Sequence, residues 1–165
     1  MEQIFKHAAG TIFIGIGATA ILDIWILGLK ALKVPTMNFA LLGRWVGHML
    51  LGRWKHERIA SAQPIRGEVV LGWAAHYAIG IAFAALLASF NGAVWLEMPR
   101  LVPALITGFV TVVAPLFIMQ PAMGGGVAFT RTPAPVFNCV KSLLNHGIFG
   151  FGLYLAAVIL AFLKH

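Results

Sequence analysis

A few polar side chains interrupt otherwise apolar stretches of the chain and are the first candidates for chemistry. They are Asp23, Glu68, His76, Gln120 and His146. Ionisable groups inside a bilayer are costly, so they face helix contacts or binding sites. Carboxylate and imidazole ligands suit a borderline divalent metal such as zinc, iron or nickel. We therefore predict ligand or ion binding at these five residues and list four of them as metal ligands: Asp23, Glu68, His76 and His146.

The spacing of these residues leaves the chemistry open. The sequence contains no compact HxxxH or ExxH pair, so any metal site has to be assembled across several helices. The same groups suit a proton relay or a cationic substrate group. His76 and His146 also suit axial haem ligation, which we rank below a divalent metal. Because no nucleophile–base pair stands out, we predict no catalytic residue and leave open whether the protein is an enzyme.

Three further polar residues, Arg44, His48 and Arg131, lie in the connections between the apolar stretches. We predict that they gate the site or receive an anionic group. The run 124–126 consists of three glycines, whose amides can converge on an anion. That run lacks the rest of a phosphate-loop signature, which favours a flexible turn.

The composition indicates which kind of fold must position these groups. Of 165 residues, 60% are hydrophobic and only 10% are charged, and the mean hydropathy is +0.89. An ordinary soluble domain has about 25% charged residues. These values exclude a soluble globule, a disordered chain and a disulfide scaffold, and they point to an integral membrane protein. The one cysteine, Cys139, excludes an internal disulfide.

Four stretches are long and apolar enough to cross a bilayer, which takes about 20 residues. They are residues 8–29, 69–90, 101–119 and 143–163. Residues 18–20 outline a signal-peptide cleavage site, but the apolar run continues beyond them and favours a spanning helix. We predict an all-α bundle of four transmembrane helices that forms one domain over residues 1–165.

The first connection contains a fifth predicted helix, over residues 39–54. Apolar residues recur there with helical periodicity, and Arg44, His48, Gly52 and His56 are spaced four apart on another face. This pattern predicts an amphipathic helix in the cytoplasmic interface. Its polar stripe either faces water or covers the ends of the spanning helices.

The basic residues predict the orientation. The connection 30–66 carries seven Lys and Arg residues, and Arg131 and Lys141 follow on the same side. Only Lys6, Arg100 and Lys164 lie on the other side. The positive-inside rule then places the two basic connections in the cytoplasm and both termini outside. With this topology, the five polar residues named first all fall in the cytoplasmic half of the membrane.

Segments along nearly the whole chain resemble a family of short bacterial membrane proteins known as domain of unknown function 2938. The resemblance rests on residues 17–25, 43–48, 67–77, 119–124, 130–133 and 146–154. It implies a four-helix protein of the bacterial inner membrane. It implies no activity.

We therefore predict a binding or transport unit for a small ion or molecule in the bacterial inner membrane, with a polar site near the cytoplasmic face. A metal- or haem-dependent redox enzyme and an accessory subunit of a membrane complex stay open as alternatives. The predicted partner is the lipid bilayer. A conducting path through only four helices would require a homo-oligomer, and no nucleic-acid module is visible despite the net charge of +7.

Overall fold

The computed structural model describes residues 2–163, and no β-strand occurs among them. The longer elements are the α-helices α1 (Glu2–Ala31), α2 (Phe39–Leu50), α3 (Glu68–Glu97), α4 (Leu101–Thr111), α5 (Gln120–Met123) and α6 (Pro135–Leu163). Three shorter ones are the 3-10 turns η1 (Ile59–Ser61) and η3 (Val127–Phe129) and the π-helix η2 (Ala114–Met119). Lys164 and the two chain ends, on which part of the predicted orientation rests, lie outside the described residues.

Four helical stretches are long and apolar enough to cross a membrane. They are Phe5–Ala31, Glu68–Gly92, Leu101–Met123 and Pro135–Leu163. The prediction of an all-helical protein with four such helices is confirmed. Large apolar side chains such as Ile24, Leu27 and Phe162 are more than half exposed on these helices. Such surface is typical of proteins that contact lipid or a partner.

All four stretches extend beyond the residues that the sequence predicts, and the extensions of the third and fourth have a clear local cause. The third continues past Met119 because the π-helix η2 accommodates Pro115, and α5 then runs on to Met123. Local π adjustments of this kind let apolar helices tolerate proline. The fourth stretch begins at Pro135, where the missing amide of proline is harmless in a first helical turn.

The helix α2 is shorter than predicted and ends at Leu50. The amides of Leu51 and Arg53 both donate to the carbonyl oxygen of His48, and Gly52 adopts a φ of +79°. A left-handed glycine after the last turn is a common helix terminator. His56 therefore lies on the connection that follows α2 and not on the helix itself.

The chain forms two compact units. Unit 1 comprises Met1–Pro35, Tyr77–Thr111 and Asn145–His165. Unit 2 comprises Thr36–His76 and Val112–Leu144. The long helices α3 and α6 each contribute residues to both units.

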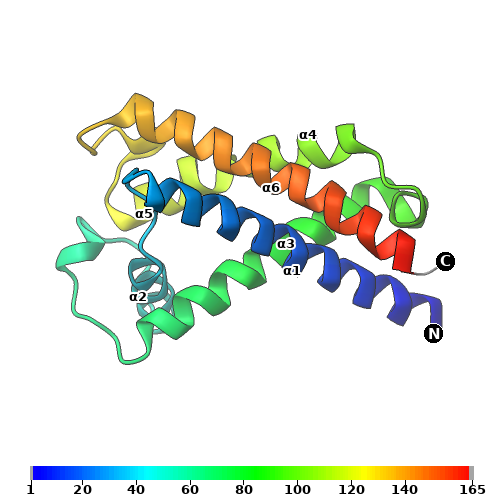
Figure 1. The fold of residues 1–165 in the computed structure, drawn as a ribbon. Helices are drawn as coiled ribbons and strands as arrows, with labels where there is room; N and C mark the ends of the chain where they lie inside the picture. The colour runs from blue at the N-terminus through cyan, green and yellow to red at the C-terminus, as the bar shows by residue number, and fades with distance from the viewer. Residues whose placement is uncertain (1, 164–165) are drawn as a thin grey trace. The chain divides into compact units, whose positions relative to one another are not determined.

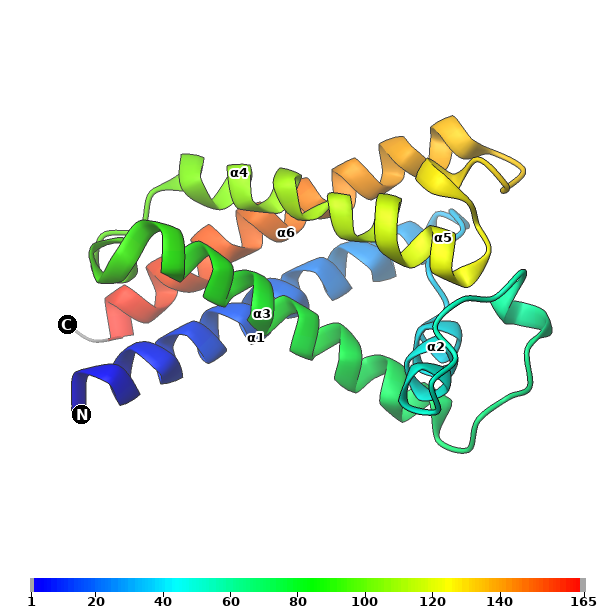
Figure 2. The same ribbon diagram turned by 180° about the vertical axis from the view of Figure 1, so that it is seen from behind.

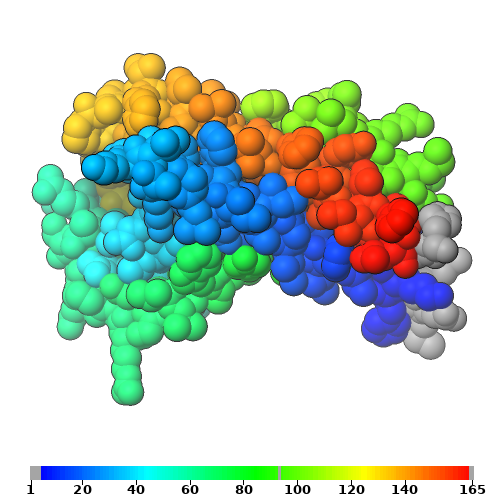
Figure 3. Space-filling model, viewed as in Figure 1, coloured from blue at the N-terminus to red at the C-terminus, as the bar shows by residue number. Residues whose placement is uncertain are grey.

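Unit 1 packs α1, α4 and the unit 1 parts of α3 and α6 around a core that includes Ile14, Leu87 and Leu153. In Figures 1 and 2, α1 and α6 run side by side, and α1 begins at the end where α6 finishes. Their surfaces touch in the space-filling view (Figure 3). Small residues allow this approach, since a Cβ on Gly152 would lie 3.0 Å from the backbone of Ala18. Close contacts between small residues are characteristic of helices in membranes.

Unit 2 contains an even closer helix crossing. A Cβ on Gly43 of α2 would overlap the carbonyl oxygen of Glu68, and a Cβ on Gly72 of α3 would overlap that of Phe39. The rings of Phe39 and Trp73 stack beside this crossing with centroids 4.3 Å apart. The two glycines thus set the distance between α2 and the start of α3.

We predict that Gly43→Ala and Gly72→Ala each lower the free energy of unfolding by about 1–3 kcal/mol, because the new methyl group meets backbone that cannot rotate away. Chemical unfolding of the purified protein in detergent measures this effect. Gly28→Ala is the matched control, since a Cβ there has no neighbour within 4 Å. Equal stability of all three variants would contradict the close crossing.

Candidate functional site

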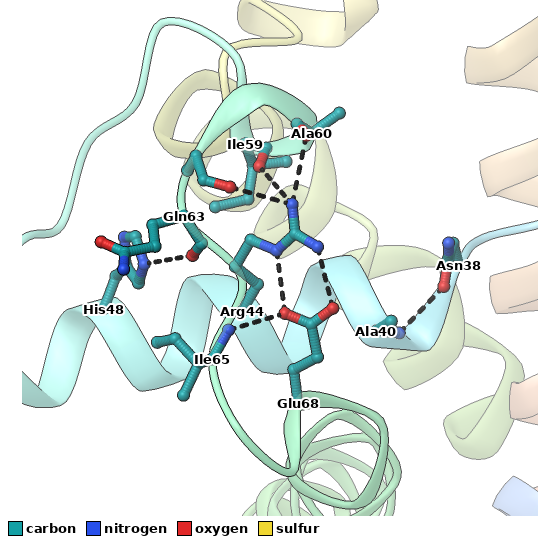
Figure 4. Close-up of polar contacts among 10 residues, drawn as sticks. Asn38, Ala40, Arg44, His48, Ile59, Ala60, Gln63, Ile65 and Glu68 are labelled. Atoms are coloured by element: carbon teal, nitrogen blue, oxygen red, sulfur yellow. Dashed lines mark hydrogen bonds and ion pairs between the residues drawn. The ribbon is translucent and has the colours of Figure 1, made fainter.

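Arg44 is the best-connected polar residue of unit 2. Its side chain is buried, and its Nε and Nη2 donate to the two carboxylate oxygens of Glu68 at 2.9 and 2.8 Å. This bidentate geometry joins α2 to the first turn of α3 (Figure 4). The hydrogen bond with Glu68 raises the pKa of Arg44 above its ordinary value. The polar stripe of α2 therefore faces the start of a long apolar helix and not water.

The third guanidinium nitrogen of Arg44 holds the connection after α2. Its Nη1 donates to the carbonyl oxygens of Ala60 and Ala62 at 3.1 Å each, and to that of Ile59 at 3.4 Å. These carbonyls belong to the η1 turn and its end, as Figure 4 shows. One side chain thus supplies the donors that this turn lacks within its own backbone.

A pair of histidines ties the same connection to α2. His48 Nδ1 and His56 Nε2 are 2.7 Å apart, and His48 Nε2 lies 3.0 Å from the carbonyl oxygen of Gln63. Both imidazoles are buried. The backbone amide of His56 also donates to the carbonyl oxygen of Ala122 at 2.8 Å, which links the connection to α5.

The glycine run forms a turn in which two of its three amides are bonded to the backbone of α5. The amides of Gly124 and Gly125 donate to the carbonyl oxygens of Pro121 and Gln120, so they are already used. A Cβ on Gly124 would overlap the carbonyl oxygen of Glu57. The run therefore lets the connection after α5 pack directly against the connection after α2.

A cleft of about 810 Å³ lies between these two connections of unit 2. Its polar lining residues are Asn38, Arg58, Gln120, Thr130, Arg131 and Thr132. In the described part of the chain, neither the Arg58 nor the Arg131 guanidinium has a hydrogen-bond or ion-pair partner. No Asp or Glu lines the cleft as described. Its chemistry is therefore that of a cationic site, which we call the unit 2 cleft.

The polar residues predicted inside unit 1 have partners of their own. Asp23 accepts a hydrogen bond from the hydroxyl group of Tyr77 at 2.9 Å. His146 Nδ1 lies 3.1 Å from Thr111 Oγ1 and 3.2 Å from the carbonyl oxygen of Gly108. These contacts give Asp23 and His146 roles in tying helices together.

His76 lies in unit 2 beside aromatic rings. Its imidazole centroid is 4.6 Å from that of Phe39 and 6.0 Å from that of Trp73. The predicted residues thus fall into separate groups: Arg44, Glu68 and His48 around η1, Gln120 and Arg131 in the unit 2 cleft, His76 beside Phe39, and Asp23 and His146 in unit 1. Within residues 2–163 no three His, Cys, Asp or Glu side chains are arranged to hold a metal ion. Metal binding at the four predicted ligands therefore stays an untested prediction.

The sequence interpretation missed three residues of these groups. Arg58 lines the unit 2 cleft, His56 pairs with His48, and Tyr77 bonds Asp23. His56 carried a signal, because it continues the four-residue spacing from Arg44 and His48. Nothing in the sequence distinguishes Arg58 from the other basic residues of its connection, which has seven Lys and Arg residues in all.

The fold and the sites define a helical protein with four helices long and apolar enough to cross a membrane, and with its cationic cleft formed by the connecting segments. The chain belongs to the family described as protein of unknown function (DUF2938), whose model matches residues 12–160. No curated protein and no solved structure matches the chain.

We predict that Arg44→Met lowers the free energy of unfolding by about 3–5 kcal/mol, because Glu68 loses its charged partner and the carbonyl groups of Ala60 and Ala62 lose their donor. Arg44→Lys should recover only part of this, since an ammonium group cannot reproduce the bidentate fork. Arg53→Lys, an exposed substitution on the same connection, is the control. Chemical unfolding in detergent compares the three variants.

Adding Glu68→Leu to Arg44→Met tests the contacts that lie outside the ion pair. If the ion pair alone mattered, the double variant would approach the wild-type stability. We expect it to stay well below, because the carbonyl groups of Ala60 and Ala62 lose the Arg44 donor and the amide of Ile65 loses the Glu68 carboxylate.

Proposed function

We propose that this chain is a multi-pass protein of the bacterial inner membrane that binds a small anionic ligand in the unit 2 cleft. One observation carries the proposal: Arg58 and Arg131 line one cleft whose described lining contains no Asp or Glu. Guanidinium groups bind carboxylates and phosphates through charge-assisted hydrogen bonds. Gln120 adds an amide donor to the same lining.

The supporting elements suit a preformed site. Ile59 and Ala60 line the cleft, and Arg44 holds the carbonyl groups of both. Arg58 directly precedes this anchored turn, so its position does not depend on a free loop. A site held ready before the ligand arrives spends less binding energy on ordering side chains.

The distribution of basic residues supports a cytoplasmic position for the unit 2 cleft. Its lining comes from residues 37–60 and 120–133, most of which belong to the two connections that carry most of the Lys and Arg residues. Arg44 is neutralised by Glu68, but the remaining bases still outnumber those predicted outside. The proposed ligand is therefore a cytoplasmic anion.

The proposed anion site uses other residues than the acids and histidines for which the sequence predicts ligand or metal binding. Asp23 and His146 have hydrogen-bond partners in unit 1, which supports a structural role for them. Of the residues predicted to bind a ligand, Gln120 and Arg131 keep that role, joined by Arg58. Arg44, Glu68 and His48 become positioning residues.

We predict that Arg58→Gln and Arg131→Gln each weaken sulfate binding about tenfold or more, since each removes a charged hydrogen-bond donor. Calorimetric titration of the full chain in detergent at fixed ionic strength measures the affinity. Arg53→Gln is the matched control, because it removes the same charge outside the cleft lining. Asp23→Asn should leave sulfate binding unchanged. An equal loss in Arg53→Gln would show general charge attraction and contradict a defined site.

The orientation makes a separate prediction. With both basic connections inside, a reporter fused to either end of the full chain lies outside the cytoplasm. We expect alkaline phosphatase fused to the C-terminus to be active in cells and green fluorescent protein at the same place to be dark. The reverse pattern would contradict a cytoplasmic cleft.

A further inference from the structure

The histidine pair of unit 2 has an unusual hydrogen-bond arrangement. His48 and His56 are both more than nine-tenths buried, and facing nitrogens of their rings are 2.7 Å apart. His56 Nδ1 is buried and has no hydrogen-bond partner in the described chain. Buried polar atoms almost always have partners, so an exception needs a physical reason.

The partners determine where the protons lie when the pair is neutral. The carbonyl oxygen of Gln63 can only accept, so His48 Nε2 carries a hydrogen. His48 Nδ1 is then an acceptor, and His56 Nε2 must donate to it. This leaves a bare lone pair on His56 Nδ1 as the place for an additional proton.

An additional proton would be poorly placed. It would make His56 a buried cation with a donor that has no acceptor, which costs free energy on both counts. Burial lowers the pKa of His56 below its ordinary value, and electrostatic interactions with His48 and Arg53 lower it further.

The surroundings of the pair offer no buried counter-charge that is free. On α2 the nearest charged group is Arg44, one turn before His48, and its partner Glu68 at the start of α3 is already committed to it. The charged residues of the connection itself are all exposed: Arg53, Lys55, Glu57, Arg58 and Arg66. The packed α5 (Gln120–Met123) carries no ionisable side chain.

We propose that His48 and His56 form a pH-sensitive latch that holds residues 52–66 closed on α2 while the pair is neutral and releases them when His56 is protonated. Residues 52–66 include Arg58, Ile59 and Ala60 of the unit 2 cleft, so release also removes one wall of the cleft. This last consequence rests on the proposed function. The latch itself does not.

The direction of the pH effect follows from linkage. In the open form His56 is exposed and titrates near its ordinary pKa of about 6.5, whereas the closed form binds the proton only at lower pH. The open form therefore binds more protons below about pH 6.5, so the closed form is fully stable above that pH and loses stability as the pH falls.

Hydrogen exchange measured by mass spectrometry on the full chain tests the latch. Protection of the peptides covering 52–66, corrected for the intrinsic pH dependence of exchange, should fall about tenfold to thirtyfold between about pH 7.5 and pH 5.0. His56→Gln should abolish this fall, because its amide can still donate to His48 but does not titrate. His7→Gln, which removes a histidine of α1, should leave the fall unchanged.

Sulfate titrations at the same two pH values separate the latch from the proposed function, because sulfate keeps its charge over this range. If protection falls but sulfate never binds, the latch stands and the anion site is wrong. If sulfate binds equally at both pH values and protection is constant, the latch is overturned. Should His56→Gln fail to fold, NMR titration of the histidines in the wild-type protein tests the latch by measuring the pKa of His56. A His56 pKa at or above about 6.5 overturns the latch.

Discussion

The structure of unit 2 depends on one buried guanidinium group. The Nε and Nη2 atoms of Arg44 join α2 to α3 through Glu68. Its Nη1 atom donates to the carbonyl oxygens of Ile59, Ala60 and Ala62 in and after the η1 turn. A buried arginine without these partners would cost several kcal/mol, so the helix crossing and the connection must form together. The glycines at positions 43 and 72 make this possible, because they let α2 approach α3 closely enough for the bidentate contact.

The same constraint explains how a connection with little regular structure becomes one wall of a cleft. Between α2 and α3 the chain has only the η1 turn, yet its polar backbone is tied to Arg44, His48 and α5. On the other side, Gly124 lets the second connection pack against Glu57. The two basic segments thus meet, and Arg58 and Arg131 line one cleft between them.

The sequence predicts those parts of the fold that depend on hydrophobicity alone. The four apolar stretches predict the four long helices, because burial or lipid contact is the only stable environment for such surface. The bounds were less predictable: a π-helix absorbs Pro115, and Pro135 begins α6 among polar residues such as Asn138 and Lys141. Arg44 and Glu68 were both singled out, but 24 residues separate them and no local rule pairs them. Which polar groups bind a ligand and which tie helices together depends on such distant pairings. Asp23, for example, accepts a hydrogen bond from Tyr77, which lies 54 residues away in the sequence.

We propose that the connections of unit 2 form an anion site between Arg58 and Arg131. The most direct measurement is anomalous X-ray diffraction from crystals of the full chain soaked with selenate, an isostere of sulfate that carries its own scattering signal. We predict an anomalous peak in the unit 2 cleft within hydrogen-bonding distance of both guanidinium groups. A well-ordered cleft with no peak at a selenate concentration that saturates binding in solution would contradict the claim.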